Sequence, residues 1–152
     1  EQLPYQFRLS ESGWTGGCDT PHCFNRIMAA AYATQGVGMV RFEISDDPLS
    51  GDDTRVLDAL ARLFLEANAK TRFVRYGLTP TRGGKLVPVM ESVIPLSLLT
   101  ENSARAHLAA LSVGAARVRA EVKALADPSV AEAYIRFTEP ALRLAAGAVC
   151  HD

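Results

Sequence analysis

The chain has 152 residues, of which 48% are hydrophobic and 22% are charged. These proportions are those of an ordinary globular protein, and they exclude a disordered polypeptide, a collagen-like repeat and a mucin-like stalk. The 16 basic and 17 acidic residues give a formal net charge of -1, so no overall field favours DNA, RNA or an anionic membrane as a partner.

The N-terminal region predicts strands separated by a loop. Residues 5–9 alternate apolar and polar side chains, which is the period of a strand with one face on a core. Residues 10–21 contain three glycines among serine and threonine, so we predict a loop. Residues 25–34 are rich in alanine, which favours a helix, but a turn-like Gln-Gly-Val-Gly segment follows them and we predict a strand. Residues 39–44 place apolar residues on one face and both charges on the other, which predicts the next strand.

An amphipathic helix is predicted after these strands. Asp52 or Asp53 is placed to cap the free N–H groups of a helix that begins near Thr54. Apolar side chains then recur every three or four residues, while charged residues occupy most of the other side. The apolar positions are Leu57, Leu60, Phe64 and Ala67. We expect this helix to pack on the sheet.

A second β-hairpin is predicted over residues 71–78 and 85–94, with a longer loop between the two strands. Pro88 lies in the second of these strands and has no N–H group to donate to a neighbouring strand. We therefore expect that strand to lie at the edge of the sheet or to carry a bulge at Pro88. Such an edge is a candidate binding surface.

Two helices are predicted in the C-terminal third. Thr100 is a natural N-cap, and a helical pattern then continues to about Ala126. An Asp-Pro-Ser segment ends this helix, and another begins at about Val130. We expect that last helix to carry Tyr134 and Phe137 on one side and to be kinked or stopped at Pro140.

The long helix has an apolar seam with heptad spacing, which starts at Ala104 and has polar residues beside it. One interpretation is that the seam covers the protein's own sheet and the last helix. The other is that part of the seam forms a dimer or contacts a partner helix. The candidate residues for that seam are Leu108, Leu111, Ala115, Val118, Val122 and Leu125.

Three cysteines, an odd and small number, argue against a disulfide framework and favour a reducing compartment, so we expect a cytoplasmic protein. Cys18, His22 and Cys23 provide three potential zinc ligands, but a structural zinc site needs four. Cys150 and His151 complete the set only if the C-terminus folds back onto this loop. A Cys18–Cys23 disulfide and free thiols are the alternatives, and a Cys–His nucleophile lacks a positioned base. We predict no metal, no cofactor and no catalytic residues.

Four basic residues on the second hairpin form a candidate patch for single-stranded nucleic acid, since aromatic residues lie near them in the sequence. They are Arg72, Arg75, Arg82 and Lys85. The competing interpretation is an ordinary exposed sheet face, which the near-zero net charge favours. His107 lies off the apolar seam and gives no catalytic signal.

In residues 68–111 an Asn-containing helix end precedes an Arg-Phe strand, a hairpin follows, and a Leu-Thr-Glu-Asn-like cap starts a long helix. With these motifs the segment resembles the YbjN family. The positions that carry the resemblance are Asn68, Arg72, Phe73, Leu98, Thr100, Glu101 and Asn102. Proteins of this family are similar in fold to type III secretion chaperones, which are small, commonly dimeric bacterial proteins that hold partner proteins. The resemblance brings no catalytic residues.

Taken together, these patterns predict one α+β domain over residues 1–152: an antiparallel sheet of about five strands, packed by an amphipathic helix and a long helix, with an extra C-terminal helix. We expect a non-enzymatic protein-binding module, chaperone-like or regulatory, which forms a homodimer and does not enter a membrane. The alternatives are a single-strand nucleic-acid-binding protein that uses the basic hairpin, and a thiol or metal-site protein that uses Cys18, His22 and Cys23.

Overall fold

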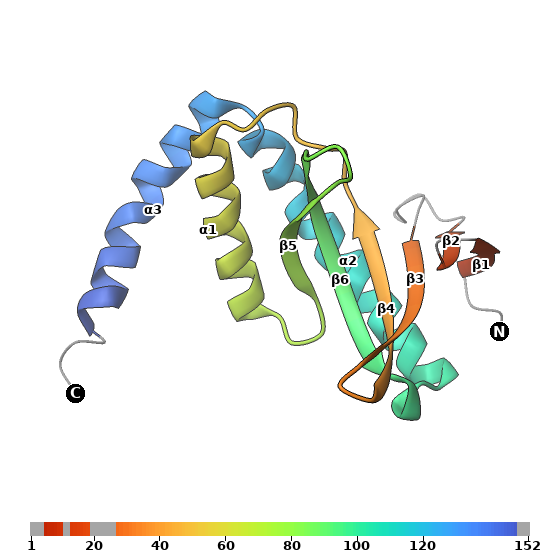
Figure 1. The fold of residues 1–152 in the computed structure, drawn as a ribbon. Helices are drawn as coiled ribbons and strands as arrows, with labels where there is room; N and C mark the ends of the chain where they lie inside the picture. Colours follow the sequence, from red (N-terminus) through yellow and green to blue (C-terminus); the bar gives the residue numbers. More distant parts are fainter. Residues whose placement is uncertain (1–4, 11–12, 19–26, 149–152) are drawn as a thin grey trace.

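The computed structural model describes residues 5–10, 13–18 and 27–148, with side-chain surroundings for residues 27–139. Within these residues the chain forms a six-stranded antiparallel sheet in the order β1-β2-β3-β4-β6-β5, together with three α-helices (Figure 1). The strands are β1 (Tyr5–Ser10), β2 (Gly13–Cys18), β3 (Ile27–Thr34), β4 (Val37–Ser45), β5 (Arg75–Pro80) and β6 (Leu86–Pro95). The helices are α1 (Thr54–Lys70), the short 3-10 helix η1 (Leu96–Leu98), α2 (Glu101–Leu125) and α3 (Pro128–Ala148).

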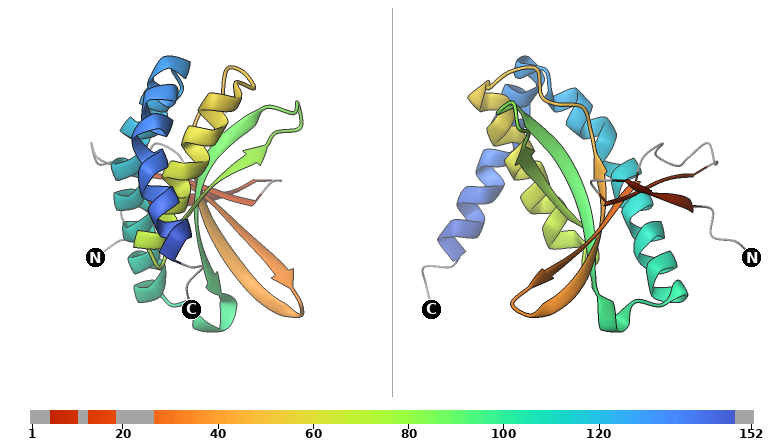
Figure 2. Two further views of the ribbon diagram at one scale, coloured as in Figure 1. Left: turned by 90° about the vertical axis from the view of Figure 1, so that its left-hand side faces the viewer. Right: turned by 45° about the vertical axis from the view of Figure 1, so that its right-hand side comes forward.

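The helices lie on one side of the sheet and leave the opposite face of the strands uncovered (Figure 2). Strand alternation explains this division. Val40, Phe42 and Ile44 of β4 point to the helices and are buried, whereas Arg41 and Glu43 point to the uncovered face. The predicted α+β class is confirmed, with six strands rather than about five.

The region expected to be a loop contains a strand, so that prediction was wrong. β2 pairs with β1 along its whole length, from Gly13 opposite Ser10 to Cys18 opposite Tyr5. It also pairs with β3 at three positions, including Gly16 opposite Ile27. Glycine is unfavourable in an isolated strand, but hydrogen bonds to a strand on each side override that weak preference. Ser10, the first residue of the predicted loop, is the last residue of β1, and residues 11–12 and 19–21 lie outside the described residues.

The hairpin of β3 and β4 turns at Gln35 and Gly36, whose φ angles are 49° and 77°. Two successive positive φ angles are typical of a two-residue turn whose twist matches that of the flanking strands. The alanine-rich segment before the turn is a strand, as predicted, because pairing of Ala29 with Phe42 places it beside the core.

Helix α1 begins where the sequence predicted. Asp53 is the N-cap, and its carboxylate accepts a hydrogen bond of 2.9 Å from the backbone N–H of Arg55. Hydrogen bonds from the Arg55 side chain and backbone lower the pKa of Asp53 to about 2. The buried face of α1 consists of Val56, Ala59, Leu60, Leu63 and Phe64.

Strand β6 is not an edge strand, contrary to the expectation from Pro88. It lies between β4 and β5 and pairs with both in an unbroken one-to-one register, without a bulge. Pro88 is tolerated because it stands just beyond the last paired residue of β4, Ser45. There the N–H of Asp46 still donates to the Pro88 carbonyl at 2.9 Å, so only the reciprocal hydrogen bond is missing. The edge strand on this side of the sheet is β5, and β1 forms the opposite edge.

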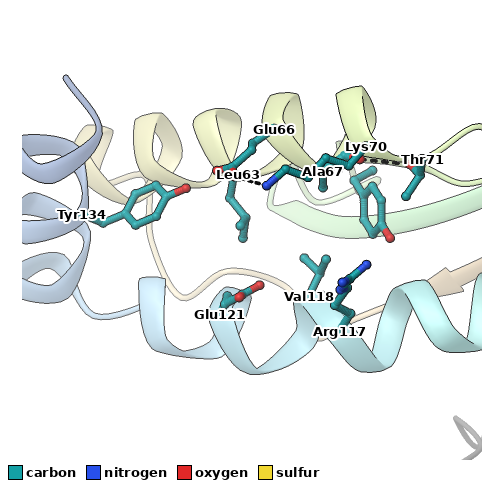
Figure 3. Close-up of a pocket in the computed structure, with 10 residues that line it drawn as sticks. Leu63, Glu66, Ala67, Lys70, Thr71, Arg117, Val118, Glu121 and Tyr134 are labelled. Carbon is teal, nitrogen blue, oxygen red and sulfur yellow. Dashed lines mark hydrogen bonds and ion pairs between the residues drawn. The ribbon is translucent and has the colours of Figure 1, made fainter. Parts of the chain in front are cut away.

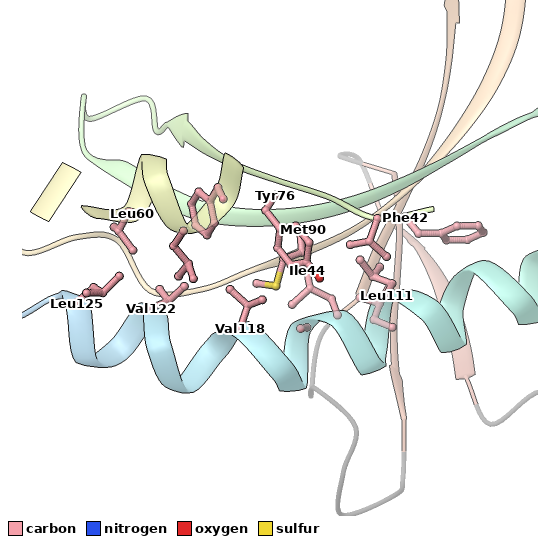
Figure 4. Close-up of a cluster of buried hydrophobic side chains, with 14 of the residues drawn as sticks. Phe42, Ile44, Leu60, Tyr76, Met90, Leu111, Val118, Val122 and Leu125 are labelled. Atoms are coloured by element: carbon pink, nitrogen blue, oxygen red, sulfur yellow. The ribbon is translucent and has the colours of Figure 1, made fainter. Parts of the chain in front are cut away.

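The apolar seam of α2 lies in the core. Figure 4 shows Leu111, Val118, Val122 and Leu125 pointing from α2 toward the strands and α1. All six candidate seam residues are at most 4% exposed. Burying a Leu or Val side chain stabilises the fold by about 1.5–3 kcal/mol, so the seam supplies a large part of the core. A homodimer of this chain would therefore use other residues.

Helix α3 differs from prediction at two points. It starts at Pro128 and continues through Pro140 without a stop. A proline inside a helix removes one hydrogen bond, and the bonds on either side preserve this 21-residue helix. Tyr134 and Phe137 do not share a packed side, because Tyr134 is half-buried while Phe137 is 84% exposed. The face toward α1 instead includes Ala131 and Ile135.

Candidate functional site: a groove beside Phe73

The connection between α1 and β5 is fixed by Asn68. Its side-chain oxygen accepts a hydrogen bond of 2.8 Å from the N–H of Tyr76, and its side-chain nitrogen donates to the Tyr76 carbonyl at 3.0 Å. The amide therefore occupies the outer edge of β5, where a further strand would pair. This contact gives a physical reason for an asparagine at the end of the helix.

Strand β5 pairs with only part of β6 and leaves the C-terminal end of β6 without a neighbouring strand on that side among the described residues. Its first residue, Arg75, pairs with Glu91, while β6 continues to Pro95. The segment before β5 crosses the end of β6 that β5 does not pair with. Thr71 anchors this segment, since its hydroxyl lies 3.0 Å from the carbonyl oxygen of Ala67 and 2.9 Å from that of Val74. Phe73 lies in this crossing segment.

A buried hydrogen-bond chain holds the backbone at Phe73. Ser92 is 1% exposed, and its hydroxyl donates to the Phe73 carbonyl at 2.6 Å. The same oxygen lies 2.7 Å from Nδ1 of His107. A serine hydroxyl has one proton, so Nδ1 of His107 must carry the proton and donate it to Ser92. Burial lowers the pKa of His107, which favours the neutral ring.

The Phe73 side chain stands against His107 and still faces solvent. The two rings meet edge to face with centroids 5.2 Å apart. Phe73 is nevertheless 61% exposed. A large aromatic side chain that packs against the protein on one side and is exposed to solvent on the other is suited to contact another molecule.

A groove of about 440 Å³ opens beside Phe73, at the boundary between the end of β6 and the uncovered sheet face. Tyr32 and Met39 are paired across β3 and β4 and form one side of this groove. Val93 and His107 contribute further surface. We call this site the Phe73 groove; it is lined by Tyr32, Met39, Arg72, Phe73, Arg75, Glu91, Val93 and His107.

The Phe73 groove has a positive charge balance. Glu91 lies 3.9 Å from the guanidinium of Arg41, which also pairs with Glu43 at 3.4 Å. Arg72 and Arg75 are exposed and make no ion pair within the described part of the chain. Two guanidinium groups are therefore available to an acidic ligand beside the aromatic surface.

The four basic residues singled out from the sequence do not form one patch. Arg72 and Arg75 line the groove, while Arg82 and Lys85 belong to the turn after β5. At about 3.3 Å per strand residue, the length of β5 separates the two pairs by roughly 17 Å. This division does not favour the single-stranded nucleic-acid alternative. Sequence reasoning also missed His107 as a groove residue and Ser92 as the buried residue that holds the backbone of Phe73, because no local motif links them.

The thiol or metal alternative falls mostly on residues that the structure does not describe. Cys18 is the last residue of β2. His22, Cys23, Cys150 and His151 lie outside the described residues. In residues 27–139, whose side chains are described, no three potential metal ligands lie together. Among the described helices, none combines the length and hydropathy needed to cross a bilayer.

Comparison with known proteins places the fold. No family model matches the sequence, and no curated protein matches it with significance. The structure is similar to the crystal structure of YbjN from E. coli, which is described as a proposed transcription regulator. The TM-score is 0.51 at 15% sequence identity, over 77% of this chain and 83% of that one. The chain thus has a YbjN-like fold, as its sequence predicted.

Proposed function

We propose that this domain is a non-enzymatic, regulatory protein-binding module, and that its partner inserts a short acidic and apolar segment into the Phe73 groove. The observation that carries the proposal is the exposed Phe73 ring, 61% accessible and braced by His107, between two arginines without ion-pair partners in the described chain. The description of YbjN as a proposed transcription regulator supports a regulatory role rather than a metabolic one.

The chemistry of the groove matches that of a binding hot spot. Aromatic side chains and arginine dominate the energetics of protein interfaces, because they combine large apolar area with directed hydrogen bonds. Burial of the Phe73 ring is worth about 1.5–3 kcal/mol, and a carboxylate on Arg72 or Arg75 adds charge-assisted hydrogen bonds. Since the groove already has its backbone fixed by Ser92, little ordering cost opposes binding.

Fluorescently labelled peptides with a central Leu or Phe test the proposal, in one series flanked by Asp and in the other by Lys. We expect the Asp-flanked peptides to bind and the Lys-flanked peptides to bind at least about tenfold more weakly. Phe73→Ala and the double variant Arg72→Gln/Arg75→Gln should each weaken binding of the Asp-flanked peptides about tenfold or more.

Two matched controls distinguish an effect that is specific to the Phe73 groove from the effect of removing any exposed phenylalanine or arginine. Phe137→Ala removes another highly exposed phenylalanine, from α3, and Arg82→Gln removes an exposed arginine from the β5–β6 turn. Neither control should change peptide affinity. The proposal fails if no Asp-flanked peptide binds, if Phe137→Ala weakens binding as much as Phe73→Ala, or if a single-stranded oligonucleotide competes for the groove.

A further inference from the structure

A second cavity lies on the helical side of the molecule, away from the Phe73 groove. It has a volume of about 240 Å³ and opens between the C-terminal halves of α1 and α2 and the first half of α3 (Figure 3). Leu63 and Ala67 of α1 and Val118 of α2 form apolar parts of its wall. We call it the interhelical cleft.

The charged groups of the interhelical cleft are only partly paired. On α1, Lys70 and Glu66 form an ion pair with each other. On α2, Arg117 and Glu121 line the cleft and have no ion-pair partner among the described residues. Figure 3 shows both side chains extending from α2 toward α1. The cleft therefore presents one unpaired positive group and one unpaired negative group along the same wall.

Two tyrosine hydroxyls complete the polar lining. Tyr134 extends from α3 into the cleft (Figure 3), and Tyr76 lines it from β5. Burial raises the pKa of both phenols, and the carboxylates of Glu66 and Glu121 raise that of Tyr134 further. Both hydroxyls thus keep their protons at neutral pH. Neither makes a hydrogen bond within the described part of the chain, so both are available to a ligand.

The spacing of the two unpaired charges suits a small zwitterion. Arg117 and Glu121 are four residues apart on one helix, so their Cβ atoms are about 5–6 Å apart on the same face. An α-amino acid has a carboxylate and an ammonium group on one carbon, and it can contact both side chains at once. A cleft of about 240 Å³ is smaller than the typical site for a drug-sized ligand or nucleotide, and it has room for one amino acid.

We propose that the interhelical cleft binds a free α-amino acid with an apolar side chain. Arg117 and the hydroxyl of Tyr76 bind the carboxylate, and Glu121 with the hydroxyl oxygen of Tyr134 binds the ammonium group. Leu63, Ala67 and Val118 contact the apolar side chain. Because Tyr134 belongs to α3, the ligand also links α3 to α1 and α2. This assignment is independent of the proposed function of the Phe73 groove.

Calorimetric titration and thermal melting of the full chain test the proposal, with L-leucine and L-phenylalanine as probes. Two analogues of leucine serve as matched controls: 4-methylpentanoate lacks the ammonium group, and 3-methylbutylamine lacks the carboxylate. We expect saturable binding of at least one amino acid, and binding at least about tenfold weaker for each analogue. No saturable binding of either amino acid up to about 10 mM would overturn the proposal, as would an analogue that binds equally well.

Substitutions of the residues that line the interhelical cleft test whether the amino acid binds there. Arg117→Gln and Glu121→Gln should each weaken binding at least about tenfold, because each leaves one ligand charge without its partner. Tyr134→Phe should weaken it less, since only one hydroxyl is lost. Arg82→Gln, in an exposed turn, and Phe73→Ala, in the groove, should leave amino-acid binding unchanged. Unchanged binding in Arg117→Gln would overturn the assignment, whatever the result of the peptide experiments.

Discussion

The hydroxyl oxygen of Ser92 lies 2.7 Å from Nδ1 of His107, and it donates to the carbonyl of Phe73 at 2.6 Å. Ser92 belongs to β6 and His107 to α2, while Phe73 lies in the connection between α1 and β5. One buried hydroxyl thus joins three segments of the fold and sets the position of the groove.

Replacing Ser92 by alanine should destabilise the protein by about 1–3 kcal/mol, because it leaves the Phe73 carbonyl and the His107 ring nitrogen without their partner in a buried place. Urea unfolding followed by circular dichroism measures the loss. Ser97→Ala, at an exposed position in η1, is the control and should stay within about 0.5 kcal/mol of the wild type. Equal stability of the two variants would show that the chain from Phe73 to His107 contributes nothing.

Stability should fall as the solution becomes more acidic than the ordinary pKa of histidine, about 6.5. Burial lowers the pKa of His107 in the folded protein, so the unfolded chain binds the proton more tightly. The contribution of His107 to the free energy of unfolding is complete above about pH 6.5 and is lost as the pH falls through the lower pKa of His107 in the folded protein. His107→Asn retains a side-chain donor near the position of Nδ1 but does not titrate. Unfolding midpoints at pH 7.5 and 5.5 should differ less for His107→Asn than for the wild type.

Gly114 on α2 gives space to Tyr76. A Cβ atom at position 114 would lie 2.5 Å from the hydroxyl oxygen of Tyr76 and 3.5 Å from the ring carbon that carries it. Gly114→Ala should therefore cost about 1–3 kcal/mol through overpacking, although alanine favours a helix. Adding Tyr76→Phe removes the clashing oxygen and should restore the stability. A double variant no more stable than Gly114→Ala would contradict this explanation.

Asn68 should be needed for the order of β5. Asn68→Ala removes both hydrogen bonds to the backbone of Tyr76, and we expect a loss of about 1–3 kcal/mol. Asn68→Asp keeps the acceptor for the Tyr76 N–H but loses the donor to its carbonyl, so its stability should be intermediate. Hydrogen exchange at Tyr76 provides a local measurement, and equal protection in the wild type and Asn68→Ala would contradict the role of this amide.

The elements predicted correctly are those whose signals are local. Asp53 and Thr100 cap α1 and α2 as expected, because a cap is decided by the few backbone groups next to it. The heptad spacing identified the buried face of α2, since helical periodicity alone decides which side chains share a face. The YbjN-like fold was recognised from the same kind of local pattern, including Asn68.

The incorrect predictions concern residues whose neighbours are distant in the chain. The sequence predicts a loop at β2, because its glycines disfavour a strand unless β1 and β3 pair with it. It predicts an edge or a bulge at Pro88, because it does not show where β4 ends. For the candidate site, Arg72 and Arg75 were identified as basic residues, but their separation from Arg82 and Lys85 depends on the length of β5.

Caps, periodicity and composition were therefore enough to predict an α+β protein with an amphipathic helix, a hairpin and a long helix, because each of these depends on residues within a few positions of one another. Only the tertiary structure brings Phe73, Ser92 and His107 into contact, and only the tertiary structure decides that the seam of α2 packs in the core of this chain. Strand order and side-chain contacts depend on which distant segments gain most by burial together, and no local pattern encodes that choice.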